Sequence, residues 1–163
     1  SPGRWVPRIA LEGTLGDEVD FANDRLGRGG TARLTAELRP TDHVQISTAL
    51  NRRWLDVNAG DGMEGRLFTA DVARLRIMYL FTDRIWLRLI GEWVETKRDP
   101  ALYIESVPRR SGGLSSSAIL ALRLNWQTVA YLGYADNREI DPEEELERNG
   151  RRLFFKVSYA FRG

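Results

Sequence analysis

The chain of 163 residues contains no cysteine, a single histidine and no long apolar run. The absence of cysteine excludes a disulfide framework and a thiolate metal site. No run approaches the roughly 18 consecutive apolar residues that a transmembrane helix needs, which excludes a helical membrane protein. It does not argue against a membrane β-barrel, because the strands of such a barrel are apolar only at every second residue.

Net charge is also nearly absent, although 29% of the residues are charged. A formal charge of +1 favours neither a nucleic-acid partner nor an anionic membrane surface, and we expect no nucleic acid to bind. The length fits one domain with a sizeable interior, so we expect residues 1–163 to form a single domain. The chain starts Ser-Pro-Gly without Met, and we expect it to be a processed or trimmed product.

The clearest pattern is the strict alternation of the last stretch, Leu153 to Phe161. Successive side chains leave a β-strand on opposite faces, so this pattern predicts a strand with one apolar and one polar face. The apolar set comprises Leu153, Phe155, Val157, Tyr159 and Phe161, and the polar set Lys156, Ser158 and Ala160. Such a strand fits either a soluble core or a lipid surface.

Seven earlier segments alternate in the same way, which predicts eight antiparallel strands in all. Their expected ranges are Arg8–Leu15, Thr31–Arg39, His43–Arg53, Leu67–Tyr79, Arg84–Val94, Ser117–Leu124 and Gln127–Ala135. Residues 16–30, 56–65, 95–116 and 136–150 are expected to be long loops, and the other three connections short turns. The alternation is irregular in the upstream part of the fourth strand, which indicates either a bulge or the end of the buried zone. The only helical signal is at Asp141–Leu146, where an N-cap, a proline and acidic residues favour a helical turn.

Two features favour a membrane barrel over a soluble one. Long and short connections alternate, as in outer-membrane barrels, which have short periplasmic turns and long outer loops. Aromatic residues also gather near the expected strand ends, as in the aromatic girdles at membrane interfaces. We therefore predict an all-β, eight-stranded antiparallel up-and-down transmembrane β-barrel of the outer-membrane type. The expected interface aromatics are Trp5, Trp54, Tyr79, Trp93, Trp126, Tyr134, Tyr159 and Phe161.

Charged residues recur in mid-strand opposite the apolar set. In a soluble barrel this would be the solvent face. In an eight-stranded membrane barrel it fills a narrow interior, where buried charges need partners. We expect a salt-bridged ionic network in the lumen, with Lys156 beside Glu12 where the last strand meets the first. The expected network comprises Arg8, Glu12, Arg33, Glu37, Arg74, Arg76, Arg88, Glu92, Arg123 and Lys156.

The segment from Phe155 to Phe161 resembles the C-terminal strand signal read by the barrel assembly machinery of the outer membrane, although Arg162 and Gly163 follow the final aromatic. More broadly, the run from Leu67 to Phe161 resembles the end of a bacterial family in which a carbohydrate-binding family-nine-like domain precedes an outer-membrane barrel of unassigned function. The resembling pieces are Tyr79–Thr82, Leu87–Ile90, Asn125–Thr128, Gly133–Asn137 and Lys156–Tyr159. The resemblance implies a fold and a location, not a reaction, and leaves open a small complete barrel or the last eight strands of a larger one.

The function expected from the sequence is a non-enzymatic membrane scaffold or anchor with a salt-bridged interior. The alternative is a pore, or part of a larger transport barrel, for small polar or anionic solutes. We expect no catalytic residues, cofactor or metal, because the only histidine, His43, lies beside a tight turn at the periplasmic end. The expected location is the bacterial (Gram-negative) outer membrane with both termini periplasmic. The expected partners are the lipid bilayer, lipopolysaccharide and the assembly machinery, and the chain is expected to be a monomer.

Overall fold

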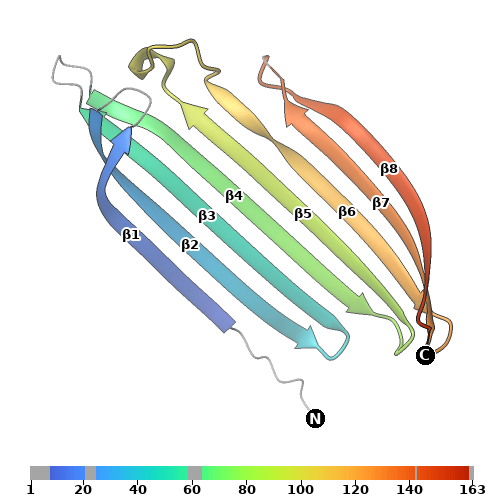
Figure 1. The fold of residues 1–163 in the computed structure, drawn as a ribbon. Helices are drawn as coiled ribbons and strands as arrows, with labels where there is room; N and C mark the ends of the chain where they lie inside the picture. Colours follow the sequence, from blue (N-terminus) through green and yellow to red (C-terminus); the bar gives the residue numbers. More distant parts are fainter. Residues whose placement is uncertain (1–7, 21–24, 59–63, 142, 162–163) are drawn as a thin grey trace.

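One antiparallel sheet contains all the strands of the computed structural model, which describes residues 8–20, 25–58, 64–141 and 143–161 (Figure 1). Each strand pairs with its neighbours in sequence, so the predicted eight-stranded up-and-down order is confirmed. The strands are β1 (Arg8–Asp20), β2 (Arg25–Thr41), β3 (Val44–Asn58), β4 (Glu64–Leu80), β5 (Ile85–Arg98), β6 (Arg110–Arg123), β7 (Thr128–Ile140) and β8 (Leu146–Tyr159). A 3-10 helix, η1 (Pro100–Leu102), lies between β5 and β6, and within the described ranges no helix is long and apolar enough to span a membrane.

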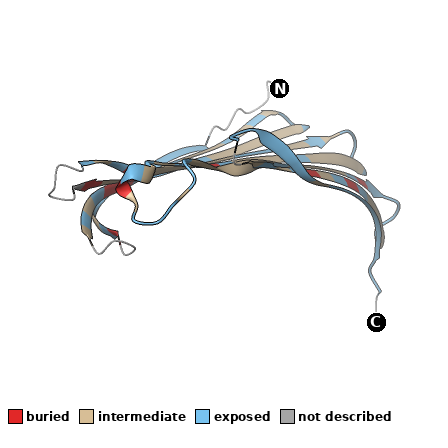
Figure 2. Ribbon diagram, turned by 90° about the horizontal axis from the view of Figure 1, so that it is seen from above, coloured by how far each residue is buried: buried red, intermediate tan, exposed pale blue. Residues whose placement is uncertain are grey.

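The sheet is open, which corrects the expectation that the first and last strands pair with each other. β1 and β8 are its two edges, and the strand order gives them no partner beyond β2 and β7 among the described residues. Viewed from above, the sheet is bowed rather than closed into a ring (Figure 2). Glu12 and Lys156 therefore lie on opposite edges, and the expected proximity of these two residues is wrong.

The strands are longer than the sequence pattern predicted. Much of the expected loop at residues 16–30 belongs to β1 and β2, and much of that at residues 136–150 belongs to β7 and β8. Only the connection between β5 and β6 keeps a long stretch outside the strands. In these segments the antiparallel pairing continues past the apolar part of each strand. The backbone N–H and C=O groups there are therefore hydrogen-bonded between strands, although the side chains are polar.

The short turns between β2 and β3, β4 and β5, and β6 and β7 lie at one end of the sheet (Figure 1). A side-chain oxygen accepts a backbone hydrogen bond in each of them, and between β2 and β3 the Thr41 hydroxyl accepts one from the His43 N–H. The Thr82 hydroxyl accepts hydrogen bonds from the backbone N–H groups of Arg84 and Ile85, and the Asn125 side chain accepts one from Gln127. At the opposite end, the Asp141 carboxylate accepts from the Glu145 N–H in a turn where Glu144 has a φ of 66°. This segment is a turn, and the expected helical turn is wrong.

Two local irregularities have clear causes. The pairing of β3 with β4 shifts between Leu55 and Asp56, so that Leu67 is the extra residue of a bulge, one of the two alternatives expected in this part of the chain. On β8, Phe154 interrupts the polar face. It lies directly opposite Gly133, and any Cβ at Gly133 would overlap the Phe154 ring, so the ring fills the space that the glycine leaves.

Glycine at position 113 has a close-packing role that can be tested. A Cβ there would overlap the backbone carbonyl oxygen of Arg138 on β7, whereas a Cβ at Gly91 would meet nothing within 4 Å. We predict that Gly113→Ala lowers the free energy of unfolding by about 1–3 kcal/mol, because backbone cannot yield as a flexible side chain can.

Gly91→Ala is the matched control. It should leave stability unchanged or raise it by less than about 1 kcal/mol, since alanine restricts the unfolded chain more than glycine does. Urea unfolding of both variants in detergent micelles provides the comparison. Equal stability of the two variants would contradict the close approach of β6 to β7.

Candidate functional site

The two faces of the sheet differ in chemistry, and the register fixes which residues share each face. We call the face that contains Leu11 the apolar face. Its rows join aliphatic and aromatic residues of neighbouring strands, as in Leu11–Leu34–Leu50 and Leu120–Leu132–Phe155. These side chains are exposed to an unusual degree: Leu11 is 77% and Phe155 69% accessible. An apolar surface of this extent marks a binding or membrane-facing surface.

The apolar residues of this face form a band that crosses the strands diagonally. A row followed along the hydrogen-bonding direction starts on apolar Ile9 of β1 and ends on charged Arg151 of β8. The full row is Ile9, Ala36, Thr48, Leu75, Gly91, Ser116, Asp136 and Arg151. Between β1 and β8 the limit of the band shifts by about one residue per strand. A residue spans about 3.3 Å along a strand, and neighbouring strands are about 4.8 Å apart. If the edge of the band lies perpendicular to the axis of a barrel, the strands must be tilted from that axis by roughly 35–40°.

At the loop end, the apolar band meets a row of charged residues on the same face, which we call the charged belt. In each strand the first charged residue comes two or four positions beyond the last apolar residue of the band, and the spacing is four in β2 and β6, where a glycine lies between the two. These first charges are Asp17, Arg28, Arg52, Asp71, Glu95, Arg110, Asp136 and Arg151. Because these residues share a face with the band, they mark the level at which its continuous apolar rows end, although Val19, Leu26 and Trp54 lie beyond them on the same face.

The charged belt was not predicted from the sequence, because most of its residues were expected in loops or at strand ends. Ion pairs connect neighbouring strands along it. Arg52 donates two hydrogen bonds to Asp71, at 2.7 and 3.0 Å, and Arg110 donates one to Glu95 at 2.5 Å. The missed signal was parity: Arg52 follows Leu50 by two residues and Asp71 precedes Ala73 by two, so each shares the apolar face.

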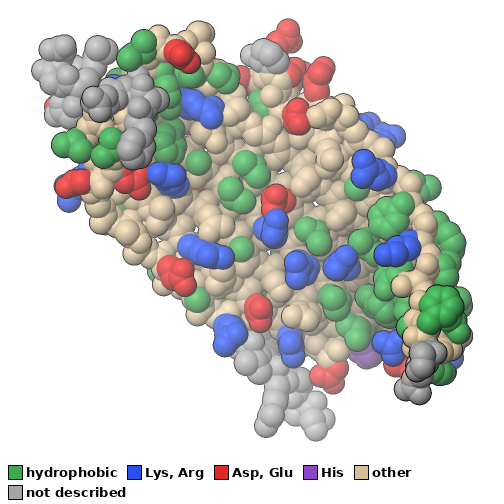
Figure 3. Space-filling model, viewed as in Figure 1, with side chains coloured by type: hydrophobic (Ala, Val, Ile, Leu, Met, Phe, Trp, Pro, Cys, Tyr) green, Lys and Arg blue, Asp and Glu red, His purple; other side chains and the backbone are tan. Residues whose placement is uncertain are grey.

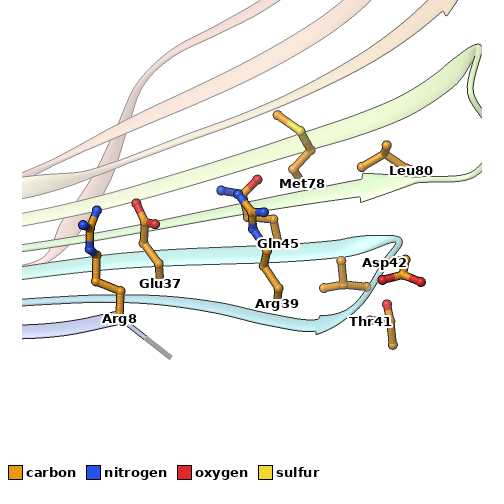
Figure 4. A pocket seen from close by; sticks show the side chains of 9 residues that line it. Arg8, Glu37, Arg39, Thr41, Asp42, Gln45, Met78 and Leu80 are labelled. Carbon is orange, nitrogen blue, oxygen red and sulfur yellow. The ribbon is translucent and has the colours of Figure 1, made fainter. Parts of the chain in front are cut away.

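The opposite face, called here the polar face, contains all ten residues of the predicted ionic network. Register places Arg8 opposite Glu37, Glu12 opposite Arg33, and Arg74 opposite Glu92. Charged side chains spread over the middle of the face turned to the viewer in Figure 3. Figure 4 shows Arg8, Glu37, Arg39 and Gln45 projecting from the same side of the strands into a hollow of about 780 Å³, which Met78 and Leu80 also line.

Pairing on the polar face is sparser than a packed network requires. Arg74 donates a hydrogen bond to Glu92, with Nε 2.6 Å from Oε2, and Arg123 lies 5.8 Å from the ring centre of Trp86. Within the part of the chain that the structure describes, no ion pair joins the other eight members. Seven of the ten are basic and three acidic, so this face has an excess of positive charge.

At the loop end, the segment around η1 covers part of the polar side of the sheet. Leu102 packs on Leu55, Val57 and Leu67, and only 7% of its surface is accessible. The Arg25 guanidinium donates a hydrogen bond to the Leu102 carbonyl and another, at 2.8 Å, to the Asp20 carboxylate. Burial raises the pKa of the adjacent Tyr103 phenol, against the opposing charge of Arg98. No local sequence pattern predicts this contact, because it joins residues far apart in the chain.

The expected interface aromatics divide between the two ends of the band. Tyr79 and Tyr159 lie at the short-turn end, where each makes an edge contact, with Phe81 at 4.7 Å and with Phe161 at 4.8 Å. Trp126, in the turn between β6 and β7, is 69% accessible. On the apolar face, register places Trp54, Trp93 and Tyr134 toward the loop end. Trp5 lies outside the described residues.

His43 lies at a short turn, with Nδ1 2.9 Å from the Leu80 carbonyl oxygen, so its ring caps the end of β4. No acidic residue bonds to it among the described residues, and the Leu80 carbonyl alone holds its ring in place. The same ranges contain no group of three or more His, Cys, Asp or Glu side chains that could hold a metal ion. The acidic residues of the expected loop at residues 136–150 lie in β7, where Asp136 is paired with arginines, in the turn at Asp141 and in β8, which contains Glu147.

Comparison of the chain with family models, with curated proteins and with solved structures finds no match in any of the three. The resemblance to the barrel region that follows a carbohydrate-binding domain therefore stays a prediction.

Proposed function

We propose that this chain forms part of the wall of a membrane β-barrel with more than eight strands, whose water-filled interior passes small polar solutes and favours anions. The observation that carries this proposal is the open sheet with an exposed apolar band on one face and unpaired basic residues on the other. The proposed location is the bacterial outer membrane, with the start of β1 and the end of β8 on the periplasmic side.

The apolar band supports a membrane position in two ways. Its strands would tilt by roughly 35–40° if the band lies level, and this value falls within the range of transmembrane barrels. The charged belt limits the band at the loop end, and Tyr79 and Tyr159 flank it at the turn end. A bilayer offers apolar surroundings of limited thickness between two polar interfaces, and the band matches that profile.

The open edges favour a larger barrel over the scaffold expected from the sequence. In lipid, the free N–H and C=O groups along β1 and β8 need partners from further strands. β1 runs from the turn end and β8 returns to it, so an antiparallel ring requires an even number of added strands. A ring of eight is just filled by its own side chains, whereas a wider one encloses water. The scaffold function depended on the closed, filled ring.

The excess of arginine on the polar face supports anion preference. In water, unpaired guanidinium groups need no carboxylate partner, which accounts for the sparse pairing of Arg33 and Arg76. Rings of Arg and Lys favour anions in pores. Nothing in the described geometry supports a catalytic site, so the proposed function is transport without chemistry.

The water accessibility of neighbouring positions on the two faces of the sheet tests whether the apolar face contacts lipid and the polar face contacts water. The chain has no cysteine, so single substitutions give no background. We predict that Ser47→Cys and Ser117→Cys, on the polar face, react with a membrane-impermeant charged thiol reagent at least about tenfold faster than their neighbours Ile46→Cys and Ala118→Cys, which would face lipid. The measurement is the labelling rate in membranes that contain the protein.

The two remaining outcomes have distinct meanings. Equal rates at all four positions would exclude a membrane position for the apolar band. Low rates at all four, with the protein still in the membrane, would exclude the water-filled interior and favour the filled scaffold.

Ion selectivity tests the charge of the interior. In planar bilayers under a KCl gradient, we expect a reversal potential that indicates preference for chloride over potassium. The variant Arg33→Gln/Arg76→Gln should reduce the permeability ratio on the order of twofold, because it removes two unpaired charges from the polar face. A matched control, Arg84→Gln, changes an exposed turn residue and should leave the ratio unchanged. Preference for potassium in the unmodified channel would contradict the proposal.

A further inference from the structure

One carboxylate on the apolar face holds three arginines. Asp136 of β7 is 7% accessible, and it accepts hydrogen bonds at 2.9 Å from the Nε atoms of Arg138 and Arg148. Arg151 of β8, directly opposite Asp136 in the register, places its Nε 3.6 Å from the same carboxylate. The three guanidinium groups come from two neighbouring strands and meet at one point.

The cluster has donors left over. A guanidinium carries five N–H donors, whereas a carboxylate has two oxygens, so the three arginines cannot all be satisfied by Asp136. Their side chains are 40%, 43% and 56% accessible, so the unused N–H groups reach the surface. The local charge of three arginines and one aspartate is positive by two.

This excess is larger than at the other ion pairs of the charged belt. Arg52 and Asp71 balance each other through two hydrogen bonds. Around Glu95, Arg110 and Lys97 leave an excess of one, with the Lys97 ammonium at 3.6 Å. Positive charge on this face is therefore concentrated between β7 and β8.

The cluster also adjoins an apolar surface on the same face. The next positions toward the turn end are Tyr134 on β7 and Leu153 on β8, which are opposite each other. Below them lie Leu132 and Phe155, and all four side chains are accessible, from 41% for Tyr134 to 72% for Leu153. A ligand that matches both parts has an anionic group and a long apolar tail.

We propose that Arg138, Arg148 and Arg151 bind the phosphate of a lipid headgroup, whose acyl chains lie along Tyr134, Leu153 and Phe155. Planar guanidinium groups match the oxygen geometry of phosphate and bind it through two parallel hydrogen bonds. A free phosphate or an acidic peptide would use the arginines but not the apolar strip beneath them. This inference rests on the proposed function, because it requires the apolar band to face lipid.

The Arg148→Gln/Arg151→Gln variant tests the proposal without removing the partner of Asp136. Arg138 still bonds to that carboxylate, so no buried charge is left alone. The charge-matched control, Arg39→Gln/Arg84→Gln, removes two exposed arginines near the short-turn end. Arg148→Lys/Arg151→Lys keeps both charges but loses the bidentate geometry.

Native mass spectrometry in maltoside micelles measures the binding of phosphatidic acid and, in parallel, of phosphatidylcholine. We expect the unmodified protein and the control to bind phosphatidic acid at least tenfold more tightly than phosphatidylcholine. The Gln variant should lose this preference, and the Lys variant should retain only part of it. Inorganic phosphate at the same concentration should not displace the lipid, because it lacks the acyl chains.

Equal affinity of the protein for both lipids would overturn the proposal, as would an equal loss in the control variant. Displacement by inorganic phosphate would reassign the cluster to free anions and also overturn it. These outcomes are separable from failure of the proposed function, because the cysteine-labelling rates report the position of the band independently of headgroup preference. A protein that labels as expected but does not distinguish the lipids retains the first proposal and loses this one.

Discussion

The two-residue period of the β-strand, kept in the central part of all seven antiparallel pairings, determines the main features of this molecule. Each pairing keeps residues of equal parity on one face, so a single shift by one residue would mix the two faces. The irregular pairings occur near the strand ends, between Leu38 and Thr41, at Leu55–Asp56 and at Asn137–Arg138. The central part of every strand therefore keeps its faces separate, and the sheet has one apolar and one charged surface despite its lack of a large core.

Because the sheet has no large core, its apolar face is not buried by the rest of the described chain. Among the described residues only five hydrophobic side chains are buried, and four of them, Leu55, Val57, Leu67 and Leu102, form a cluster on the polar side of the sheet rather than along the apolar face. Hydrogen bonds of the ladder hold the strands together, but they do not remove the apolar face from water. The proposed lipid contact supplies that burial, and added strands at β1 and β8 would satisfy the backbone groups that a bilayer cannot.

The sequence predicted local pairing well and global closure poorly, for a physical reason. Alternation is a property of neighbouring residues, so the number of strands, their order, the shared face of Arg8 and Glu37, and the irregularity before Phe68 could all be predicted. Closure depends on the accumulated curvature of eight strands, which no single residue determines. The charged belt was missed for another reason: Asp136 was assigned to a loop by composition, and Arg151 lay just before the expected start of the last strand, although their parity with Tyr134 and Leu153 placed them on a strand face.

The diagonal course of the apolar band across the strands also determines where the charged belt lies. Because the limit of the apolar band shifts by about one residue per strand, Asp136 and Arg151 occupy a row that begins at Ile9, and only a tilted sheet brings Arg28, Arg52 and Arg151 to one level. In an untilted sheet these charges would fall inside the apolar zone of neighbouring strands, where an uncompensated arginine is costly. Under the proposed function, the tilt of the strands, the charged belt and a lipid-facing band have one common geometric explanation, and the arginines around Asp136 place positive charge at the edge of the proposed lipid zone.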